Sequence, residues 1–493
     1  MSPSVEPFNE AKYKALMDGL ECSEIKKSDL EFSGRIDAEY YQKKFLQYED
    51  TVRKHQYLQL SKIADFLIGP FGSAYDTSSY VDQSDYRYIR GQDVKPFLLQ
   101  DVSPRYMAEN DYVRLKKYAL NTNDILVSVV GTLGNACIVQ EHEVPAIFSC
   151  KSTAIKVKQV NPFYLLSYLN SNYGKSLLLR KERGAIQKGL NLDDLKTLDV
   201  PIFSDKLSQK TEELIMYALD RMGKAKQSYA EAEKHLEVIL GSLKTNPSKN
   251  YSIKMLADSF LSSGRLDAEY YQPKYDAFFR MLDGFETTRI PNEFVVLKSS
   301  GSNYAESISD IGVIKTKQLT NSGVNIDGIE SYFTKETCLE NKSVFLANND
   351  VVFASMGVGS LGKVSLFSYD GDRQFVTDST LRIYRAKKTS RVLPEVLCVF
   401  LQSSIGQELI YRYVVGSTGI INIYDDDMAK IPVPILDQGI QKNIAVKVQE
   451  SFALRRQAKQ LLEYAKQVVE MAIEQGEDIS LAWLKNKFSQ LEV

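Results

Sequence analysis

The chain has 493 residues, of which 44% are hydrophobic and 25% are charged, and its formal net charge is −2. This length predicts several domains of ordinary globular composition, and the charge balance argues against a non-specific nucleic-acid-binding protein. The five cysteines form no Cys-x-x-Cys pair and the three histidines lie far apart, which argues against a disulfide framework, a metal site or histidine-dependent catalysis. Because the N-terminus lacks a signal pattern and no apolar run approaches about 18 residues, we expect a cytoplasmic protein without a membrane contact.

Taken in order, segments typical of strands alternate along the chain with segments typical of helices. Residues 8–20 are expected to form a short amphipathic helix that ends near Gly19. From about residue 21 to 205, short β-branched and aromatic runs are separated by glycine and Asp/Asn turns, with one helix expected over 162–180. The second half repeats this order, with a helix expected over 394–412, and each half closes on Val-Pro-Ile.

One stretch occurs twice in the sequence and predicts a duplicated fold. Ser33-Gly-Arg-Ile-Asp-Ala-Glu-Tyr-Tyr-Gln-Lys-Lys-Phe45 returns as Ser263-Gly-Arg-Leu-Asp-Ala-Glu-Tyr-Tyr-Gln-Pro-Lys-Tyr275, with ten of thirteen positions identical. We call these stretches the first and second repeat motifs, and they predict two tandem copies of one module. The N-terminal helix is most similar to residues 233–243, with Gly19 over Gly241, which indicates that the N-terminus completes a circularly offset repeat.

After each closing proline the apolar spacing becomes helical. The apolar positions step by three and four residues, at Met222, Ala225, Tyr229, Ala232, Leu236, Ile239 and Leu243, and at Leu454, Ala458, Leu461, Ala465, Val468 and Ala472. This spacing is that of a coiled-coil seam, and the alternating alanines suit closely approaching helices. We therefore predict an α+β fold of two tandem mixed α/β modules, each followed by a long helix, with the two helices pairing as an antiparallel coiled coil. The alternative is that each helix packs on its own module.

No stretch supports a catalytic site. Gly357-Val-Gly-Ser-Leu-Gly-Lys-Val364 is similar to a phosphate-binding loop, which would make the chain a nucleotide hydrolase using Lys363. However, no residue with a hydroxyl group follows the lysine. The next residues predict a strand, whereas a phosphate site needs a helix N-terminus there. A β-turn is the favoured interpretation. Asn161-Pro-Phe-Tyr164 resembles a methyltransferase loop, but Asn-Pro is also a good helix start.

Polar glycine-containing segments recur at matching places in the two copies and are candidate DNA contacts. Arginine can read guanine and glutamine can read adenine, whereas lysines can meet phosphates. In copy one the candidates are Ser73, Tyr80, Arg87, Arg90, Gln92 and Lys95, with Gln187 and Lys188 in a late glycine loop. In copy two they are Asn303, Tyr304, Lys315, Lys317 and Gln318, with Ser417, Thr418 and Asn422 in the corresponding loop. Taken alone, each cluster is also explained as a solvated surface loop. The recurrence of such clusters at matching places, with different side chains, favours a two-part recognition protein.

The doubled order of elements resembles the specificity (S) subunit of type I restriction-modification systems, the HsdS family. The resemblance covers roughly residues 21–475 and includes Gly69-Pro-Phe-Gly-Ser73, Arg90-Gly-Gln-Asp-Val94 and Val200-Pro-Ile202, although copy two lacks Gly-Pro-Phe-Gly-Ser. It implies an N-terminal helix at 1–20, target recognition domain 1 at 21–205, a spacer helix at 206–245, target recognition domain 2 at 246–437, a second spacer helix at 438–475 and a C-terminal tail at 476–493.

The resemblance also implies a function and a set of partners. The chain is expected to be a non-catalytic subunit that binds double-stranded DNA at a bipartite asymmetric site, each domain reading one half-site. Two methyltransferase (M) subunits carrying S-adenosylmethionine are expected to methylate adenines there, and restriction motor (R) subunits using ATP and Mg²⁺ are expected to join them. No cofactor is expected in this chain. The alternative function is a coiled-coil scaffold whose β modules bind protein partners.

Overall fold

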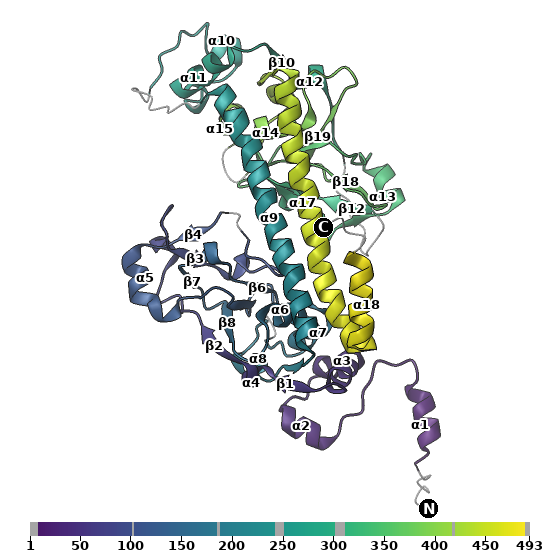
Figure 1. Ribbon diagram of the computed structural model, residues 1–493. Coiled ribbons are helices and arrows are strands. Elements are labelled where there is room, and N and C mark those ends of the chain that lie inside the picture. Colours follow the sequence, from purple (N-terminus) through teal and green to yellow (C-terminus); the bar gives the residue numbers. More distant parts are fainter. Residues whose placement is uncertain are drawn as a thin grey trace, which may run out of the picture. The chain divides into compact units, whose positions relative to one another are not determined.

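The chain folds into two compact units. The structure is a computed structural model that describes residues 8–100, 103–184, 188–241, 251–300, 311–416 and 420–488. Unit 1 comprises Met1–Leu219 and Ala458–Val493, and unit 2 comprises Asp220–Gln457 (Figure 1). The boundaries fall inside the two long helices α9 (Asp205–Leu240) and α17 (Gln438–Gln475), so each unit holds part of both helices.

Unit 1 is built on two small sheets and a strand pair. An antiparallel sheet has the order β2-β8-β5-β6, and a second sheet has the order β4-β3-β7, with β3 and β7 parallel. The strands are β1 (Tyr57–Gln59), β2 (Ala64–Ile68), β3 (Arg87–Ile89), β4 (Arg105–Tyr106), β5 (Ile125–Ser128), β6 (Ala136–Ile138), β7 (Ala146–Phe148), β8 (Ser152–Val157) and β9 (Asp199–Pro201), of which β1 and β9 pair.

The strands of unit 1 are preceded, connected and followed by short helices. They are α1 (Glu10–Met17), α2 (Lys27–Ser33), α3 (Lys43–Arg53), α4 (Leu60–Ile63), α5 (Glu109–Leu115), α6 (Pro162–Asn170), α7 (Asn172–Leu179), α8 (Leu192–Lys196) and α18 (Glu477–Phe488). Short 3-10 helices are η1 (Ala38–Tyr41), η2 (Thr77–Ser79), η3 (Gly91–Asp93), η4 (Lys116–Tyr118) and η5 (Glu141–Glu143). No residue of α1 is buried, so its part in completing a repeat stays a prediction.

Unit 2 repeats the same pairings. Its sheets have the orders β11-β19-β16-β17 and β15-β12-β18, again with one parallel pair, β12 and β18, and β10 pairs with β20 as β1 does with β9. Unit 2 also has an additional strand pair, β13 and β14. The strands are β10 (Thr287–Arg289), β11 (Phe294–Leu297), β12 (Ile311–Ile314), β13 (Leu319–Thr320), β14 (Gly323–Val324), β15 (Tyr332–Phe333), β16 (Val351–Ala354), β17 (Val364–Leu366), β18 (Gln374–Thr377), β19 (Leu381–Ala386) and β20 (Pro432–Pro434). The helices are α10 (Phe260–Ser263), η6 (Glu269–Tyr271), α11 (Pro273–Leu282), α12 (Ile290–Glu293), η7 (Thr316–Gln318), α13 (Lys335–Glu340), α14 (Pro394–Gln402), α15 (Ser404–Arg412) and α16 (Asp425–Met428). The shared strand order confirms the tandem duplication.

The single helix expected late in each module is two helices. In unit 1 the break falls at Ser171, whose hydroxyl accepts a hydrogen bond from the Gly174 amide at 3.1 Å and so caps α7. In unit 2 Ser403 accepts from Gly406 at 3.1 Å and caps α15 in the same way. The prediction of one continuous helix was therefore wrong, because a serine cap can restart a helix inside an otherwise apolar run.

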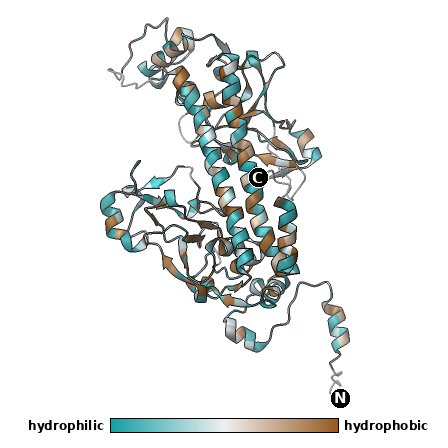
Figure 2. Cartoon of the chain, viewed as in Figure 1, coloured by the Kyte–Doolittle hydropathy of each residue, from teal (hydrophilic) through white to brown (hydrophobic). Residues whose placement is uncertain are grey.

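The long helices bury most of their predicted seam positions. Ala225, Ala232 and Leu236 on α9 are 0% exposed, as are Ala458, Ala465 and Val468 on α17. Met222, Ile239 and Leu454 are half-buried, and Leu243 lies outside the described residues. Within unit 2 the pairing is antiparallel, because Ser451 Oγ donates to Ala225 O at 2.6 Å and Ser228 Oγ donates to Lys447 O at 2.9 Å. Figure 2 shows hydrophilic and hydrophobic residues alternating along both helices. Among the described residues, no helix is long and apolar enough to cross a membrane.

Candidate nucleic-acid interface

Three polar segments of unit 1 meet near the facing ends of β5 and β6. They are residues 90–95, the glycine turn 131–134 and the described ends of the late loop, residues 183–184 and 188–189. Asn135 Nδ2 donates to Val94 O at 3.3 Å, which ties the first segment to the turn. Leu190 N donates to Val129 O at 3.0 Å, which ties the late loop to the same place. The structure therefore brings together segments that lie far apart in the sequence.

Arg87 lies inside the fold rather than on its surface. The residue is 9% exposed on β3, where its guanidinium donates to Glu143 Oε1 at 3.3 Å and to Gln100 O at 3.1 Å. Breaking a buried ion pair leaves an uncompensated charge, so a base contact by Arg87 requires a costly opening. This burial favours a structural role for Arg87.

Arg90 is partly exposed and is held by a neighbouring carboxylate. Its Nε and Nη2 donate to the two oxygens of Asp93 at 2.9 and 2.7 Å, and Nη2 also donates to Ser103 O at 3.0 Å. The backbone amide of Arg90 donates to Asp93 as well, at 2.9 Å, and caps η3. Since Nε and Nη2 are engaged by Asp93 and Ser103, a base contact by Arg90 falls to Nη1 unless the pair with Asp93 opens.

The remaining candidates of copy one lie at or near the surface. Ser73, Gln92 and Lys95 are exposed. Tyr80 is half-buried, with its ring centroid 5.9 Å from that of Tyr75 and 5.5 Å from that of Tyr88. Two neighbouring rings therefore hold the ring of Tyr80, which keeps part of its surface exposed.

The turn before Tyr80 exposes an aromatic side chain that our sequence analysis missed. A Cβ on Gly69 would lie 2.5 Å from Phe148 O, so glycine allows the two backbone segments to approach closely there. Phe71, between the two glycines of this turn, is 68% exposed. Exposed aromatic rings can stack on bases, and an aromatic residue framed by turn glycines was the available signal.

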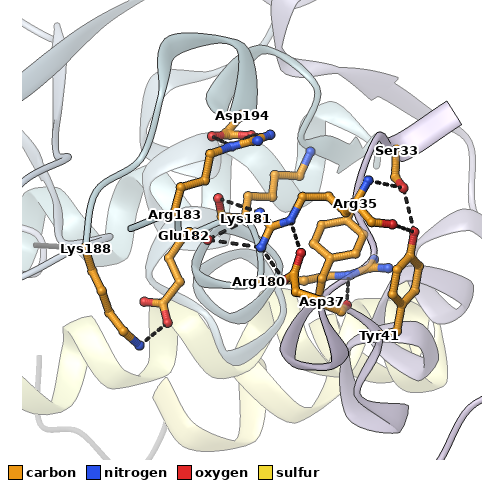
Figure 3. A network of polar contacts seen from close by, with 11 residues as sticks. Ser33, Arg35, Asp37, Tyr41, Arg180, Lys181, Glu182, Arg183, Lys188 and Asp194 are labelled. Carbon is orange, nitrogen blue, oxygen red and sulfur yellow. Dashed lines mark hydrogen bonds and ion pairs between the residues drawn. The ribbon is translucent and has the colours of Figure 1, made fainter. Parts of the chain in front are cut away.

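The late loop of unit 1 is closed by a pair of backbone hydrogen bonds. Arg183 N donates to Gly189 O and Gly189 N donates to Arg183 O, each at 2.9 Å. The Arg183 guanidinium pairs with the buried carboxylate of Asp194, and exposed Lys188 pairs with Glu182 (Figure 3). Gln187 lies outside the described residues.

Unit 2 places a different set of side chains on the corresponding turn. Gln318 is 5% exposed and its Oε1 accepts from Lys315 N at 3.1 Å, which is the role that Asp93 has in unit 1. Lys315 is half-buried, and exposed Lys317 pairs with Glu330 at 2.5 Å. Lys317 occupies the position of Gln92. Asn303 and Tyr304 lie outside the described residues.

The late loop of unit 2 is closed by the same kind of bridge. Val415 N donates to Asn422 O and Asn422 N donates to Val415 O, each at 2.8 Å. Gly357 N donates to Ile421 O at 3.0 Å, so this loop also contacts the glycine turn of its unit. Asn422 is half-buried, and its Oδ1 has no hydrogen-bond partner within the described residues. Ser417 and Thr418 lie outside the described residues.

The lysine-containing glycine turn does not have the structure of a phosphate-binding loop. Gly357, Gly359 and Gly362 all adopt positive φ, and strand β17 begins directly after Lys363. No helix N-terminus follows to receive a phosphate, so the predicted β-turn is confirmed. Within the described ranges, no group of His, Cys, Asp and Glu side chains is placed to hold a metal ion.

The fold and these segments define a duplicated α+β protein with polar surface segments at equivalent places in its two units. No protein-family model matches the chain. A stretch of 111 residues is 30% identical to the type I restriction enzyme EcoBI specificity subunit of Escherichia coli. This match covers 22% of the chain and 23% of that protein, so it spans less than a quarter of the relative. It confirms the resemblance to type I specificity subunits.

Solved structures of such subunits are also similar to the chain. An S subunit of a type I restriction-modification system from M. genitalium matches with a TM-score of 0.38 and 12% identity, over 85% of this chain and 94% of that one. An HsdS subunit from Thermoanaerobacter tengcongensis matches with a TM-score of 0.28 and 13% identity, over 85% of this chain and 97% of that one.

Proposed function

We propose that this chain is the DNA-reading, non-catalytic specificity subunit of a type I restriction-modification complex. Each unit reads one half of a bipartite asymmetric site and thereby directs adenine-N6 methylation and restriction. The observation that carries the proposal is the pair of equivalent turns that differ in chemistry. Arg90 and Gln92 in unit 1 are replaced by Lys315 and Lys317 in unit 2, on the same 3-10 turn. One framework with two sets of polar side chains is suited to two different half-sites.

The partners follow from the same proposal. As the resemblance to type I specificity subunits implies, two methyltransferase subunits dock along α9 and α17 and supply S-adenosylmethionine. Motor-nuclease subunits, which use ATP and Mg²⁺, join for restriction. An adenine must leave the base stack before it can be methylated, so binding by the specificity subunit is expected to assist distortion of the duplex.

The first experiment is long-read sequencing of modified bases in the host genome, with and without this gene. We expect one bipartite N6-methyladenine motif to disappear on deletion and to return when the gene is restored on a plasmid. A methylome unchanged by deletion would count against the proposal.

The second experiment assigns a half-site to unit 1. Arg90→Ala is expected to weaken binding to one half-site by roughly 1–3 kcal/mol if the arginine exchanges its pairing with Asp93 for a bidentate base contact. Binding is measured on the wild-type site and on sites with either half scrambled, at several salt concentrations. An equal loss on DNA whose first half-site is scrambled would remove this role from Arg90.

A scaffold that binds proteins through its modules is the second candidate. Its support is a stretch of exposed apolar side chains before the second repeat motif, including Ile253 at 88% and Leu261 at 69% exposure. Specific DNA binding by the complex with its methyltransferase distinguishes the two, because a scaffold shows no sequence preference.

A further inference from the structure

Each repeat motif forms the same network of polar contacts in its own unit. Ser33 Oγ and Tyr41 OH lie 2.5 Å apart, and Tyr41 OH donates to Arg35 O at 3.1 Å. In the second motif Ser263 Oγ and Tyr271 OH lie 2.5 Å apart, and Tyr271 OH donates to Arg265 O at 2.9 Å. The motif is thus repeated in its three-dimensional contacts as well as in its sequence.

The arginine of each motif is held by its own aspartate. Arg35 Nε donates to Asp37 Oδ1 at 2.6 Å, and the second oxygen of Asp37 pairs with Nη2. Arg265 donates to both oxygens of Asp267, at 2.8 and 2.6 Å. The two arginine side chains are only 12% and 17% exposed. A bidentate pair fixes the plane of the guanidinium and leaves its other donors aimed in one direction.

Each arginine also donates to backbone carbonyls at the start of the late loop of its unit. Arg35 Nη1 donates to Lys181 O at 3.4 Å and to Glu182 O at 3.3 Å, directly before the bridge residue Arg183 (Figure 3). Arg265 reaches the equivalent carbonyl, Val414 O, at 2.9 Å through Nη2, the nitrogen that also pairs with Asp267, directly before the bridge residue Val415. Its Nη1 has no hydrogen-bond partner within the described residues. Carbonyls just past a helix end lack helical partners, so an arginine is a suitable donor for them.

An aromatic ring adds a second constraint in each unit. Tyr40 lies between two arginines, with the Arg35 and Arg180 guanidinium carbons 4.8 and 4.1 Å from the ring centre. Arg180 ends α7 and also donates to Tyr40 O at 2.7 Å. In unit 2 Tyr270 lies between Arg265 and Arg412, each 4.7 Å from the ring centre. The motif therefore binds both the helix end and the chain that leaves it.

We propose that Arg35 and Arg265 are positioning residues that fix the base of the late loop, each for the half-site read by its own unit. This inference rests on the proposed function. The motif is nearly identical in the two units because its task is the same, whereas the loops differ because they face different bases. Arg35 and Arg265 make no base contact in this proposal; they act through the bridges Arg183–Gly189 and Val415–Asn422.

The test uses Arg35→Lys and Arg265→Lys, which keep the positive charge but lack the planar guanidinium group with its paired hydrogen-bond donors. Each variant is co-expressed with the partner methyltransferase, and methylation is measured on DNA duplexes that carry the wild-type motif or single-base changes in either half. We expect Arg35→Lys to lower base selectivity about tenfold in one half-site only, and Arg265→Lys to do so in the other, on the scale of one or two lost hydrogen bonds. Equal loss in both half-sites, or in neither, would overturn the proposal.

A second readout separates this inference from the proposed function. Amide hydrogen exchange of the free chain is expected to speed up about tenfold at Arg183 and Gly189 in Arg35→Lys, because local opening sets the exchange rate. Unchanged exchange there overturns the positioning role regardless of any result with DNA. If the wild-type chain directs no methylation but exchange in Arg35→Lys changes as expected, the proposed function and the link to half-sites are refuted. The role of Arg35 in holding the base of the late loop is then retained.

The matched control is Arg385→Lys in unit 2. Arg385 also donates to both oxygens of a buried aspartate, Asp350, at 2.8 and 2.6 Å, and to a backbone carbonyl, Phe345 O, at 2.8 Å, but neither partner belongs to a repeat motif or to a late loop. It is expected to leave selectivity in both half-sites within about twofold, as usual for sites away from a network. If Arg35→Lys fails to fold, Ser33→Ala replaces it. Ser33 Oγ accepts from the Arg35 amide at 3.2 Å, so the same half-site should be weakened to a smaller extent.

Discussion

Units 1 and 2 share their strand order, yet they do not stabilise it with the same side chains. In unit 1 the hydroxyls of Tyr164 and Tyr168 on α6 donate to the carbonyls of Pro201 and Asp199, at 2.5 and 2.6 Å. The equivalent positions on α14 are Val396 and Phe400, which are buried without a hydroxyl. The framework is therefore set by its pattern of burial and by glycine and serine turns, while individual hydrogen bonds are interchangeable. The exposed polar positions on the corresponding turns also differ between the two units.

The largest effect is expected at the glycine that both units share after the serine cap. A Cβ at Gly174 would lie 2.1 Å from Tyr168 O, and a Cβ at Gly406 would lie 2.1 Å from Phe400 O. Gly174→Ala and Gly406→Ala should each lower the free energy of unfolding of their own unit by roughly 3 kcal/mol, because backbone must move. Denaturant unfolding measures this.

The control for this pair is Gly223→Ala on α9, where a Cβ would meet nothing within 4 Å. It should be neutral or stabilising by roughly 0.5–1 kcal/mol, since alanine favours a helix. If Gly174→Ala unfolds no more easily than Gly223→Ala, the shared turn does not determine the framework.

The next effect tests the difference between equivalent surface positions. Gln92→Ala should cost roughly 1–3 kcal/mol of discrimination at one base pair, whereas Lys317→Ala should weaken all sequences alike and reduce the salt slope by about one. Both side chains are exposed on corresponding turns. DNA titrations at several salt concentrations measure both quantities. A salt-slope change in Gln92→Ala would contradict the assignment of roles.

A smaller effect is expected where the two units use different core contacts. Tyr168→Phe removes the hydrogen bond to Asp199 O and should destabilise unit 1 by about 1 kcal/mol, the usual net value of a buried hydrogen bond. The reverse change, Phe400→Tyr, adds a hydroxyl to a packed site and should also destabilise its unit. Stabilisation by Phe400→Tyr would show that unit 2 already contains a suitable acceptor.

The last effect concerns pH and is absent at neutral pH. Burial lowers the pKa of the Lys181 amine from 10.5 to about 8, although nearby carboxylates oppose the shift. The unfolded chain then binds more protons than the folded chain between about pH 8 and 10.5, so this group makes stability rise with pH in that window. Lys181→Met should flatten this rise in unfolding measured from pH 7 to 11. An unaltered profile would show that Lys181 titrates normally.

Much of the framework could be predicted from the sequence. The duplication, the helix seams and the β-turn at Gly357 follow from repeats, apolar spacing and the absence of a hydroxyl after Lys363. The break at Ser171 could not be inferred from apolar periodicity, because α6 and α7 continue the same apolar run. A serine followed three residues later by glycine was the only local sign.

The candidate site was harder to predict. Arg87 and Arg90 lie in one short segment, yet the first is buried against Glu143 and the second is held by Asp93. The spacing of residues along a strand does not show that the carboxylate of Glu143, distant in the sequence, pairs with Arg87. The contacts made by the repeat motifs were equally hidden, since Arg35 meets carbonyls at 181 and 182, far away in the sequence.

The bridges that close the late loops bear on how a loop sequence could be exchanged. The bridge encloses residues 184–188 in one unit and 416–421 in the other, so the two bridges close over segments of unequal length. The bridge residues are therefore suitable joining points for protein engineering. If the late loops contact DNA as proposed, a foreign segment joined there is expected to keep the same two backbone hydrogen bonds while changing the sequence that is methylated.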